Sequence, residues 1–286
     1  MYGWLVSSSE AFVDLSQLRL AILGAGNMGQ AVLAGALRAG VQASHVWATS
    51  VDAAQLAQVK NTYGVQATAD NLEAIGQAQV VVCAVKPQHM EALLAQISAA
   101  LPPQAVVVSV AAGLPLAFFE SRLSVGQPVV RVMPNTPAAV GAGVAAASAG
   151  THAGGQHMAT VMALLAGTGD VVEVPEGDQA AVGAVSGSGP AYVFYLVDAL
   201  AEAGVSVGLS RQMATRLAVG TVLGSAQLLA ETGEHPAIAR EKVSSPGGTT
   251  VKALQVLDQA GVRAAFVDAV QAAVARTHEL QAELDR

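Results

Sequence analysis

The stretch Leu20-Ala21-Ile22-Leu23-Gly24-Ala25-Gly26-Asn27-Met28-Gly29 predicts the fold of the first half of this chain. Its apolar start is typical of a buried strand, and its glycines match GxGxxG at a strand-to-helix turn. In this pattern Gly24 permits the tight turn, Gly26 lets a diphosphate approach the backbone, and Gly29 allows close packing of helix on sheet. The N–H groups at the helix start then attract the anion. The stretch therefore predicts a dinucleotide site, and a turn that serves packing alone is the alternative.

Further apolar runs continue this pattern along the chain. They cover residues 46–49, 80–85, 106–110, 129–133 and 171–174, and segments of helical length separate most of them. Continuous β-branched runs between helices are typical of a parallel sheet that is covered on both faces. We therefore predict an α/β fold, a Rossmann-type doubly wound parallel sheet, over residues 18–175.

Residues 176–286 are predicted to form an all-helical substrate and dimerisation domain. No strand-like run occurs there, and helical spacing covers residues 192–203, 211–231, 250–259 and 263–280. The helix at 211–231 is apolar on several faces, so it must be buried on nearly all sides. A domain of this size has little room to bury it alone, so we expect a second subunit to cover part of it. An ordinary central helix of one domain is the alternative.

The composition excludes several classes of protein. Of 286 residues, 52% are hydrophobic and only 12% are charged, with a net charge of −7. This aliphatic content excludes disorder, and the lack of any basic cluster argues against nucleic acid or anionic membrane as a partner. Two long uncharged stretches, 92–119 and 132–169, are broken by prolines and glycines, so neither is expected to span a membrane.

The chain start and the lone cysteine complete these expectations. Residues 1–17 lack a basic signal-peptide start, so we expect an N-terminal extension outside the fold and a cytoplasmic protein. Cys83 is the single cysteine, which excludes an intrachain disulfide. The six histidines are scattered without metal-ligand spacing, so no metal site is expected.

The end of the run at 46–49 bears on the choice of dinucleotide. NAD-binding versions carry an acidic residue at this place, which binds the ribose 2′-hydroxyl. Here the run ends in Thr49 and Ser50, with Asp52 two residues beyond. Hydroxyls accept a 2′-phosphate without the repulsion of a carboxylate, although no arginine stands nearby. The pattern favours NADPH, with NADH as the alternative.

Other polar turns are candidates for binding. Lys86 follows a buried run and precedes a proline, which favours a functional role over a surface role. In the helical half, residues 244–250 and 186–190 combine glycines and hydroxyls before a helix start, which suits a carboxylate. Plain helix capping is the alternative for both.

Taken together, six motifs resemble the pyrroline-5-carboxylate reductase family, the last enzymes of proline biosynthesis. The resemblance extends from about Arg19 to Leu280. The matching segments are the loop Gly24 to Gly29, the pair Asp70-Asn71, Ala84-Val85-Lys86-Pro87-Gln88, Arg131-Val132-Met133-Pro134-Asn135-Thr136-Pro137, Ser186 to Tyr192 (SGSGPAY) and Ser245-Pro246-Gly247-Gly248-Thr249-Thr250.

This resemblance implies an NAD(P)H-dependent imine oxidoreductase that reduces (S)-1-pyrroline-5-carboxylate to L-proline, as a homodimer or homodecamer. It implies that cofactor is bound by Gly24, Ala25, Gly26, Asn27, Met28, Thr49, Ser50, Asn71, Ala84, Val85, Lys86, Pro87, Val110, Ala111 and Ala112. It implies that substrate is bound by Glu176, Ser245, Gly248, Thr249 and Thr250, with the catalytic Thr250 hydroxyl near the ring nitrogen.

Two departures and two rival functions remain. Ala180 and Gly183 replace the Asp and Thr of the family's DAVTALSGSGPAY, and Lys242 also departs from many members just before the SPGG turn, so substrate affinity is in question. A β-hydroxyacid dehydrogenase would need a catalytic lysine in the helical half, and residues 211–231 contain none. A non-catalytic nucleotide-binding relative would not need the intact SPGGTT and PNTP segments.

Overall fold

The computed structural model describes residues 13–284, which form two compact units. The sheet unit comprises residues 13–188 and 273–284, and the helical unit comprises residues 189–272. Residues 176–188, which the sequence analysis assigned to the helical half, are themselves helical but cluster with the sheet.

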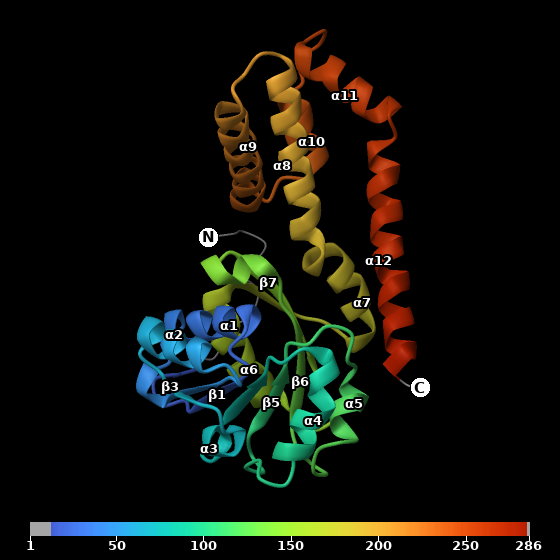
Figure 1. Ribbon diagram of the computed structural model, residues 1–286. Coiled ribbons are helices and arrows are strands. Elements are labelled where there is room, and N and C mark those ends of the chain that lie inside the picture. Colours follow the sequence, from blue (N-terminus) through green and yellow to red (C-terminus); the bar gives the residue numbers. More distant parts are fainter. Residues whose placement is uncertain (1–12, 285–286) are drawn as a thin grey trace. The chain divides into compact units, whose positions relative to one another are not determined.

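The sheet has eight strands in the order β3-β2-β1-β4-β5-β6-β7-β8 (Figure 1). Their bounds are β1 Leu20–Leu23, β2 Val46–Thr49, β3 Gln66–Thr68, β4 Val80–Cys83, β5 Val106–Ser109, β6 Val129–Met133, β7 Gly143–Ala149 and β8 Gly169–Glu173. Strands β1 to β6 are parallel, whereas β7 pairs antiparallel with β6. Because an antiparallel neighbour needs only a short connection, the 3₁₀ turn Thr136–Val140 suffices between them.

Helices cover both faces of this sheet, which confirms the doubly wound fold. Helices α1 Asn27–Arg38, α2 Ala53–Tyr63 and α6 Gly155–Leu165 pack on the face formed by Leu20, Ile22 and Val82. Helices α3 Asn71–Ile75, α4 Pro87–Ile97 and α5 Leu116–Glu120 pack on the other face, with Leu23 and Val81 (Figure 1). Successive residues of a strand point to opposite faces, so these apolar runs fill two cores at once.

Two strands were not predicted, and the expectation for the start of the chain is partly wrong. Strand β3 is short, and β7 has the sequence GVAAASA, in which small residues replace the β-branched residues that mark the other strands. The expectation that residues 1–17 lie outside the fold is wrong for Leu15, which is buried in the core beside Leu18. Residues 1–12 lie outside the described part of the chain.

The helical unit contains α8 Gly189–Ser206, α9 Arg211–Thr232, α10 Pro236–Lys242, α11 Thr249–Gln259 and the first half of α12 Val262–Leu284. The four predicted helices are confirmed, and α10 was not predicted. Gly204 of α8 faces Ala214 of α9, where an added Cβ would lie 2.9 Å from the Ala214 Cβ. The two helices therefore approach closely through small residues.

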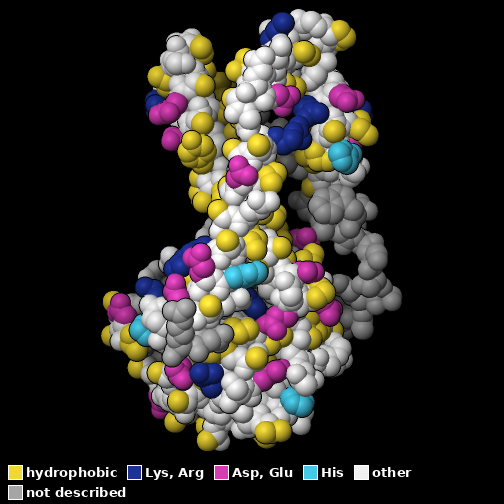
Figure 2. Space-filling model, turned by 90° about the vertical axis from the view of Figure 1, so that its right-hand side faces the viewer, with side chains coloured by type: hydrophobic (Ala, Val, Ile, Leu, Met, Phe, Trp, Pro, Cys, Tyr) yellow, Lys and Arg dark blue, Asp and Glu magenta, His cyan; other side chains and the backbone are white. Residues whose placement is uncertain are grey.

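Most apolar side chains of the helical unit are exposed. Of its residues, only Ala201, Ala214 and Ala218 are buried. Phe194, Tyr195 and Leu223 are 65%, 80% and 65% exposed, and Figure 2 shows hydrophobic side chains across the outer surface. By length and composition, Glu176–Ser206 and Arg211–Thr232 would each pass for a membrane span, and the sequence analysis had considered only two other stretches. Core helices of soluble proteins pass the same test.

Candidate active site

The glycine loop has the geometry that its pattern predicts. Gly24 has a φ of +103°, which favours glycine, and the N–H groups of Gly24 and Ala25 donate to the Thr49 carbonyl oxygen at 3.2 and 2.8 Å. A Cβ on Gly29 would lie 2.0 Å from the Gly24 oxygen, whereas a Cβ on Gly26 would meet no atom within 4 Å. Gly29 therefore serves packing, and Gly26 leaves open space over the loop.

The N-terminus of α1 fits an anionic group. Gly26 is its N-cap residue, no side chain caps it, and its first turn contains no acidic residue. The first N–H groups of a helix have no partner within the helix, so this end can donate to a diphosphate. Asn27 is exposed and Met28 is half-buried at the same end.

Thr49, Ser50 and Asn71 form one polar cluster beside this loop. The Thr49 hydroxyl donates to Asn71 Oδ1 at 2.7 Å and accepts from the Gly24 N–H at 3.2 Å. The Ser50 hydroxyl donates to Gln55 Oε1 at 2.6 Å. Asn71 Nδ2 donates to Gln96 Oε1 at 2.9 Å. The structure thus brings together three residues that lie up to 22 positions apart.

The other predicted cofactor residues follow the next two strands at the same edge. Ala84 and Val85 are half-buried after β4, with the Ala84 backbone 3.0 Å from a Cβ built on Gly24. Lys86 is exposed as the N-cap residue of α4, and Pro87 is the first residue of that helix. After β5, Val110 and Ala111 are buried and Ala112 is exposed. Because the carboxyl ends of parallel strands meet at one sheet edge, these residues lie at the same edge as the glycine loop.

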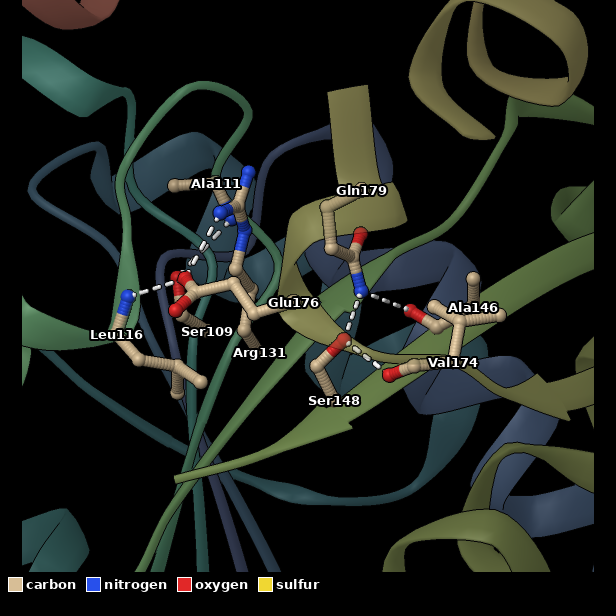
Figure 3. Close-up of polar contacts among 9 residues, drawn as sticks. All are labelled: Ser109, Ala111, Leu116, Arg131, Ala146, Ser148, Val174, Glu176 and Gln179. Carbon is tan, nitrogen blue, oxygen red and sulfur yellow. Dashed lines mark hydrogen bonds and ion pairs between the residues drawn. The ribbon is translucent and has the colours of Figure 1, made fainter. Parts of the chain in front are cut away.

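Glu176 is anchored by two groups of the sheet unit (Figure 3). Its Oε1 accepts from Arg131 Nη1 at 2.9 Å and from the Leu116 N–H at 2.6 Å. The Arg131 side chain is 5% exposed and that of Glu176 is 34% exposed. A buried guanidinium needs a partner charge, so the ion pair ties Glu176 to β6, and the Leu116 hydrogen bond ties it to the start of α5. The sequence analysis placed Arg131 in a motif but gave it no role.

A second network lies beside this ion pair (Figure 3). Gln179 Nε2 donates to Ser148 Oγ at 2.7 Å and to the Ala146 oxygen at 3.2 Å, and Ser148 Oγ donates to the Val174 oxygen at 2.8 Å. Gln179 is buried, and its Oε1 has no hydrogen-bond partner among the described residues. No sequence signal identified Gln179, because its role depends on strand β7, which was not predicted.

The PNTP motif meets the start of the SGSGPAY motif, residues 186–188, within the sheet unit. Residues Gly183–Gly187 form a short π-helical segment, in which the Ser188 N–H donates to the Gly183 oxygen at 2.8 Å. Asn135 Nδ2 donates to the Ser186 oxygen at 3.1 Å. A Cβ on Gly187 would lie 2.6 Å from Met133 Cε, so only glycine fits there without a shift of the methionine. Of the residues that depart from the family pattern, Gly183 is the first residue of this segment, and Ala180 is buried just before it.

The remaining substrate candidates lie at the start of α11 in the helical unit. Gly247 has a φ of +72°, and the Gly248 N–H donates to the Ser245 oxygen at 2.9 Å, which forms a tight turn. Gly248 is the N-cap residue of α11, and no side chain caps this helix. Thr249 and Thr250 form its first turn, so backbone N–H groups and two hydroxyls can bind a carboxylate. Lys242, just before this turn, pairs with Glu234 at 2.5 Å.

A cavity of about 670 Å³ lies elsewhere, at the amino ends of the strands. Arg19, His45, Trp47 and Glu73 are among its lining residues. This edge is opposite to the glycine loop, so the cavity is not the predicted crevice.

Comparison with known proteins gives two family matches. The model for pyrroline-5-carboxylate reductase dimerisation matches residues 176–280, and the model for NADP oxidoreductase, coenzyme F420-dependent, matches residues 19–113. A pyrroline-5-carboxylate reductase of Corynebacterium melassecola is 41% identical over 264 residues, which cover 91% of this chain and 98% of the relative.

Solved structures agree with these matches. A pyrroline-5-carboxylate reductase from Coxiella burnetii has a TM-score of 0.88 at 32% identity, covering 92% of this chain and 98% of that one. A Plasmodium falciparum pyrroline carboxylate reductase with NADP bound has a TM-score of 0.84 at 27% identity, covering 94% of this chain and 100% of that one. Identity above 40% across nearly the whole length, together with the matching fold and motifs, shows that this chain belongs to the pyrroline-5-carboxylate reductase family.

Proposed function

We propose that this chain reduces (S)-1-pyrroline-5-carboxylate to L-proline with NADPH, with NADH as the alternative donor, in the last step of proline biosynthesis. One observation carries this function: two long helices, α1 and α11, begin at glycine N-caps without a side-chain cap. Such ends bind anions, and the reaction requires one site for a diphosphate and one for a carboxylate. The family matches to the two parts of the chain support the same assignment.

When bound, the nicotinamide cofactor would supply the hydride that the imine carbon accepts. Its diphosphate would be held by residues 24–28, its ribose would face Thr49, Ser50 and Asn71, and its adenosine and nicotinamide would be lined by residues 84–87 and 110–112. Holding the two reactants in place can be worth about 7–11 kcal/mol. A protonated cyclic imine accepts hydride readily, which is consistent with a site that has no obvious strong base.

The substrate carboxylate is bound by Ser245, Gly248, Thr249 and Thr250 in this proposal. The Thr250 hydroxyl is the group near the ring nitrogen. There it would hydrogen-bond the nitrogen while hydride transfer converts the charged iminium to a neutral amine. Glu176 is the further substrate candidate, and a ligand would bind its Oε2, because its Oε1 already accepts from Arg131 and Leu116.

We further propose that the protein is a cytoplasmic homodimer, with a homodecamer as the alternative. The match to a dimerisation family over residues 176–280 and the exposed apolar side chains of the helical unit support this assembly. Light scattering at micromolar concentration tests it, and a purely monomeric protein would refute it.

The deciding assay follows the oxidation of NADPH, and separately of NADH, in the presence of pyrroline-5-carboxylate. Turnover with either cofactor supports the proposal, whereas failure with both would favour a nucleotide-binding protein without this activity.

The variant Thr250→Val tests the catalytic role. We expect turnover to fall roughly hundredfold, because the hydroxyl that stabilises the ring nitrogen is lost. NADPH affinity, measured by direct titration, should stay nearly unchanged. Thr250→Ser is the matched control, since it keeps the hydroxyl and should retain most of the activity. An equal loss of turnover and NADPH affinity would contradict the assignment.

A further inference from the structure

The loop that follows strand β5 is held at both ends by hydrogen bonds to side chains. It comprises residues 110–115, between Ser109 at the end of β5 and Leu116 at the start of α5. At the start of the loop, the Ala111 N–H donates to the Ser109 hydroxyl at 3.3 Å. At its end, the Leu116 N–H donates to Glu176 Oε1 at 2.6 Å. The end of the loop therefore depends on a residue that lies 60 positions further along the chain.

Glu176 provides the side-chain cap that helix α5 lacks in its own sequence. The residue before this helix is Pro115, which makes no capping hydrogen bond, and the first turn contains no acidic residue. The first N–H groups of a helix have no partner within the helix, and a negative charge is favourable at that end. The bond from Leu116 to Glu176 therefore fixes the point at which the loop ends and α5 begins.

Arg131 holds the Glu176 carboxylate in this position (Figure 3). Its Nη1 donates to Glu176 Oε1 at 2.9 Å, and the residue is 4% exposed. In the sheet register Arg131 lies between Ser109 of β5 and Ser148 of β7, so the three polar side chains point to the same face. Ser148 accepts from Gln179, three residues beyond Glu176. The segment that carries Glu176 is thus bonded to the sheet at two points.

The loop 110–115 lies on the nicotinamide side of the proposed cofactor site. In that proposal the 2′ position of the adenosine ribose lies at the end of β2 and the diphosphate lies beside β1. Strand β5 is on the other side of β1 from β2. A dinucleotide extends along this edge of the sheet, so its nicotinamide half reaches the ends of β4 and β5. Ala112 at the tip of the loop is exposed, whereas Ala111 and Leu114 are buried.

We propose that Arg131 is a positioning residue for the cofactor: by holding Glu176 against the Leu116 N–H, it keeps the loop 110–115 in the conformation that receives the nicotinamide. The inference rests on the proposed function, because it takes this edge of the sheet as the cofactor site. Without the guanidinium, the Glu176 carboxylate, which is 34% exposed, turns towards solvent and releases the end of the loop. Only the molecules that keep the loop conformation then bind the nicotinamide fully.

Calorimetric titration of the full-length protein with two ligands tests the proposal without turnover. The ligands are NADPH and 2′-phospho-ADP-ribose, which lacks the nicotinamide but keeps the rest of the cofactor. For Arg131→Met we expect the dissociation constant of NADPH to rise about three- to tenfold, as for the loss of one partly exposed charged hydrogen bond, and that of 2′-phospho-ADP-ribose to change by less than about twofold. A general loss of structure would weaken both ligands alike.

Two further variants complete the series at this position. Arg131→Lys keeps a cation that can pair with Glu176, so it should bind NADPH more tightly than Arg131→Met. Arg122→Met is the matched control. Arg122 also pairs with a glutamate, Glu91, at 3.2 Å, and donates to the Phe118 oxygen of α5, but it lies beyond the far end of that helix. Its replacement should change neither affinity.

Variants of Glu176 test the same contact if Arg131→Met does not fold. Glu176→Gln keeps an oxygen for the Leu116 N–H, whereas Glu176→Ala removes it, so the alanine variant should lose more NADPH affinity than the glutamine variant. Equal weakening of both ligands, or unchanged NADPH affinity in Arg131→Met and Glu176→Ala, would overturn the inference while leaving the reductase function intact. A wild type that does not bind NADPH would overturn both.

Discussion

The sheet unit buries its strands on both faces, whereas the helical unit buries only Ala201, Ala214 and Ala218. The two regions have similar apolar content along the sequence, but only the sheet unit uses it to form its own core. Side chains such as Phe119 and Leu94 are fully buried there, while Phe194 and Leu223 of the helical unit are 65% exposed.

The two units therefore obtain their stability in different ways. Burial of apolar area drives folding, at roughly 1.5–3 kcal/mol for a large aliphatic side chain. The sheet unit gains this energy within one chain. The helical unit gains little of it alone. In the proposed oligomer it would gain the rest from contact with another copy, so we expect its stability to depend on protein concentration.

The largest expected effect comes from breaking that contact. Leu223→Asp places a charge on the apolar surface of α9, and we expect it to convert the oligomer to monomer and to lower the melting temperature. Light scattering and thermal unfolding at several protein concentrations measure both. Val125→Asp is the control, because Val125 is fully exposed in the sheet unit and its replacement should change neither property. An oligomer that survives Leu223→Asp would show that α9 is not in the contact.

A smaller effect is expected within the sheet unit, at the anchor of Glu176. Glu176→Gln leaves the buried Arg131 guanidinium without a charged partner, and we expect the free energy of unfolding to fall by about 1–3 kcal/mol. The expected loss is smaller than for a fully buried ion pair, because the Glu176 side chain is 34% exposed and solvent screens its charge. Urea denaturation at one protein concentration measures it.

The matched control for Glu176 is Glu91→Gln. Glu91 pairs with Arg122 at 3.2 Å, but its side chain is 73% exposed. Exposed pairs contribute about 0–1 kcal/mol, so this variant should be nearly neutral. Equal losses from both variants would show that burial of Arg131 does not matter.

The smallest effect at neutral pH concerns Cys83. Burial raises the pKa of this thiol to about 12, from an ordinary value of 9.0. The folded state keeps the proton while the unfolded state loses it above pH 9, so the stability linked to Cys83 is complete below pH 9 and is lost as the pH rises towards 12. The slope is about 1.4 kcal/mol per pH unit. Cys83→Ala should therefore unfold less steeply with pH in this range than the wild type, and parallel curves would contradict the buried thiol.

Local sequence signals were sufficient for most of the fold. The apolar runs predicted six of the eight strands, and the glycines at 24, 26 and 29 predicted the dinucleotide loop, because each signal resides in neighbouring residues. Strand β7 could not be predicted in this way. Its alanines, glycine and serine carry no strand preference, and it forms because β6 and β8 offer backbone partners on both sides.

The candidate site shows the same limit. The cofactor turns follow from strand ends, so the sequence predicted them as one crevice. The anchor of Glu176 joins residues 45 positions apart, and the docking of Asn135 on Ser186 joins residues 51 apart. No periodicity or local motif encodes such distant pairs.

By itself, the sequence determined the doubly wound sheet, the helical second half and the glycine turns, because these depend on interactions between near neighbours in the chain. Only the tertiary structure decided that α1 begins uncapped while Asp52 and Asp70 close the adjacent helix starts, and that Arg131 anchors Glu176. It also decided that the apolar helices stay exposed within one chain. Charge, capping and burial act through space, so their consequences for the site and for assembly appear only once distant segments are placed side by side.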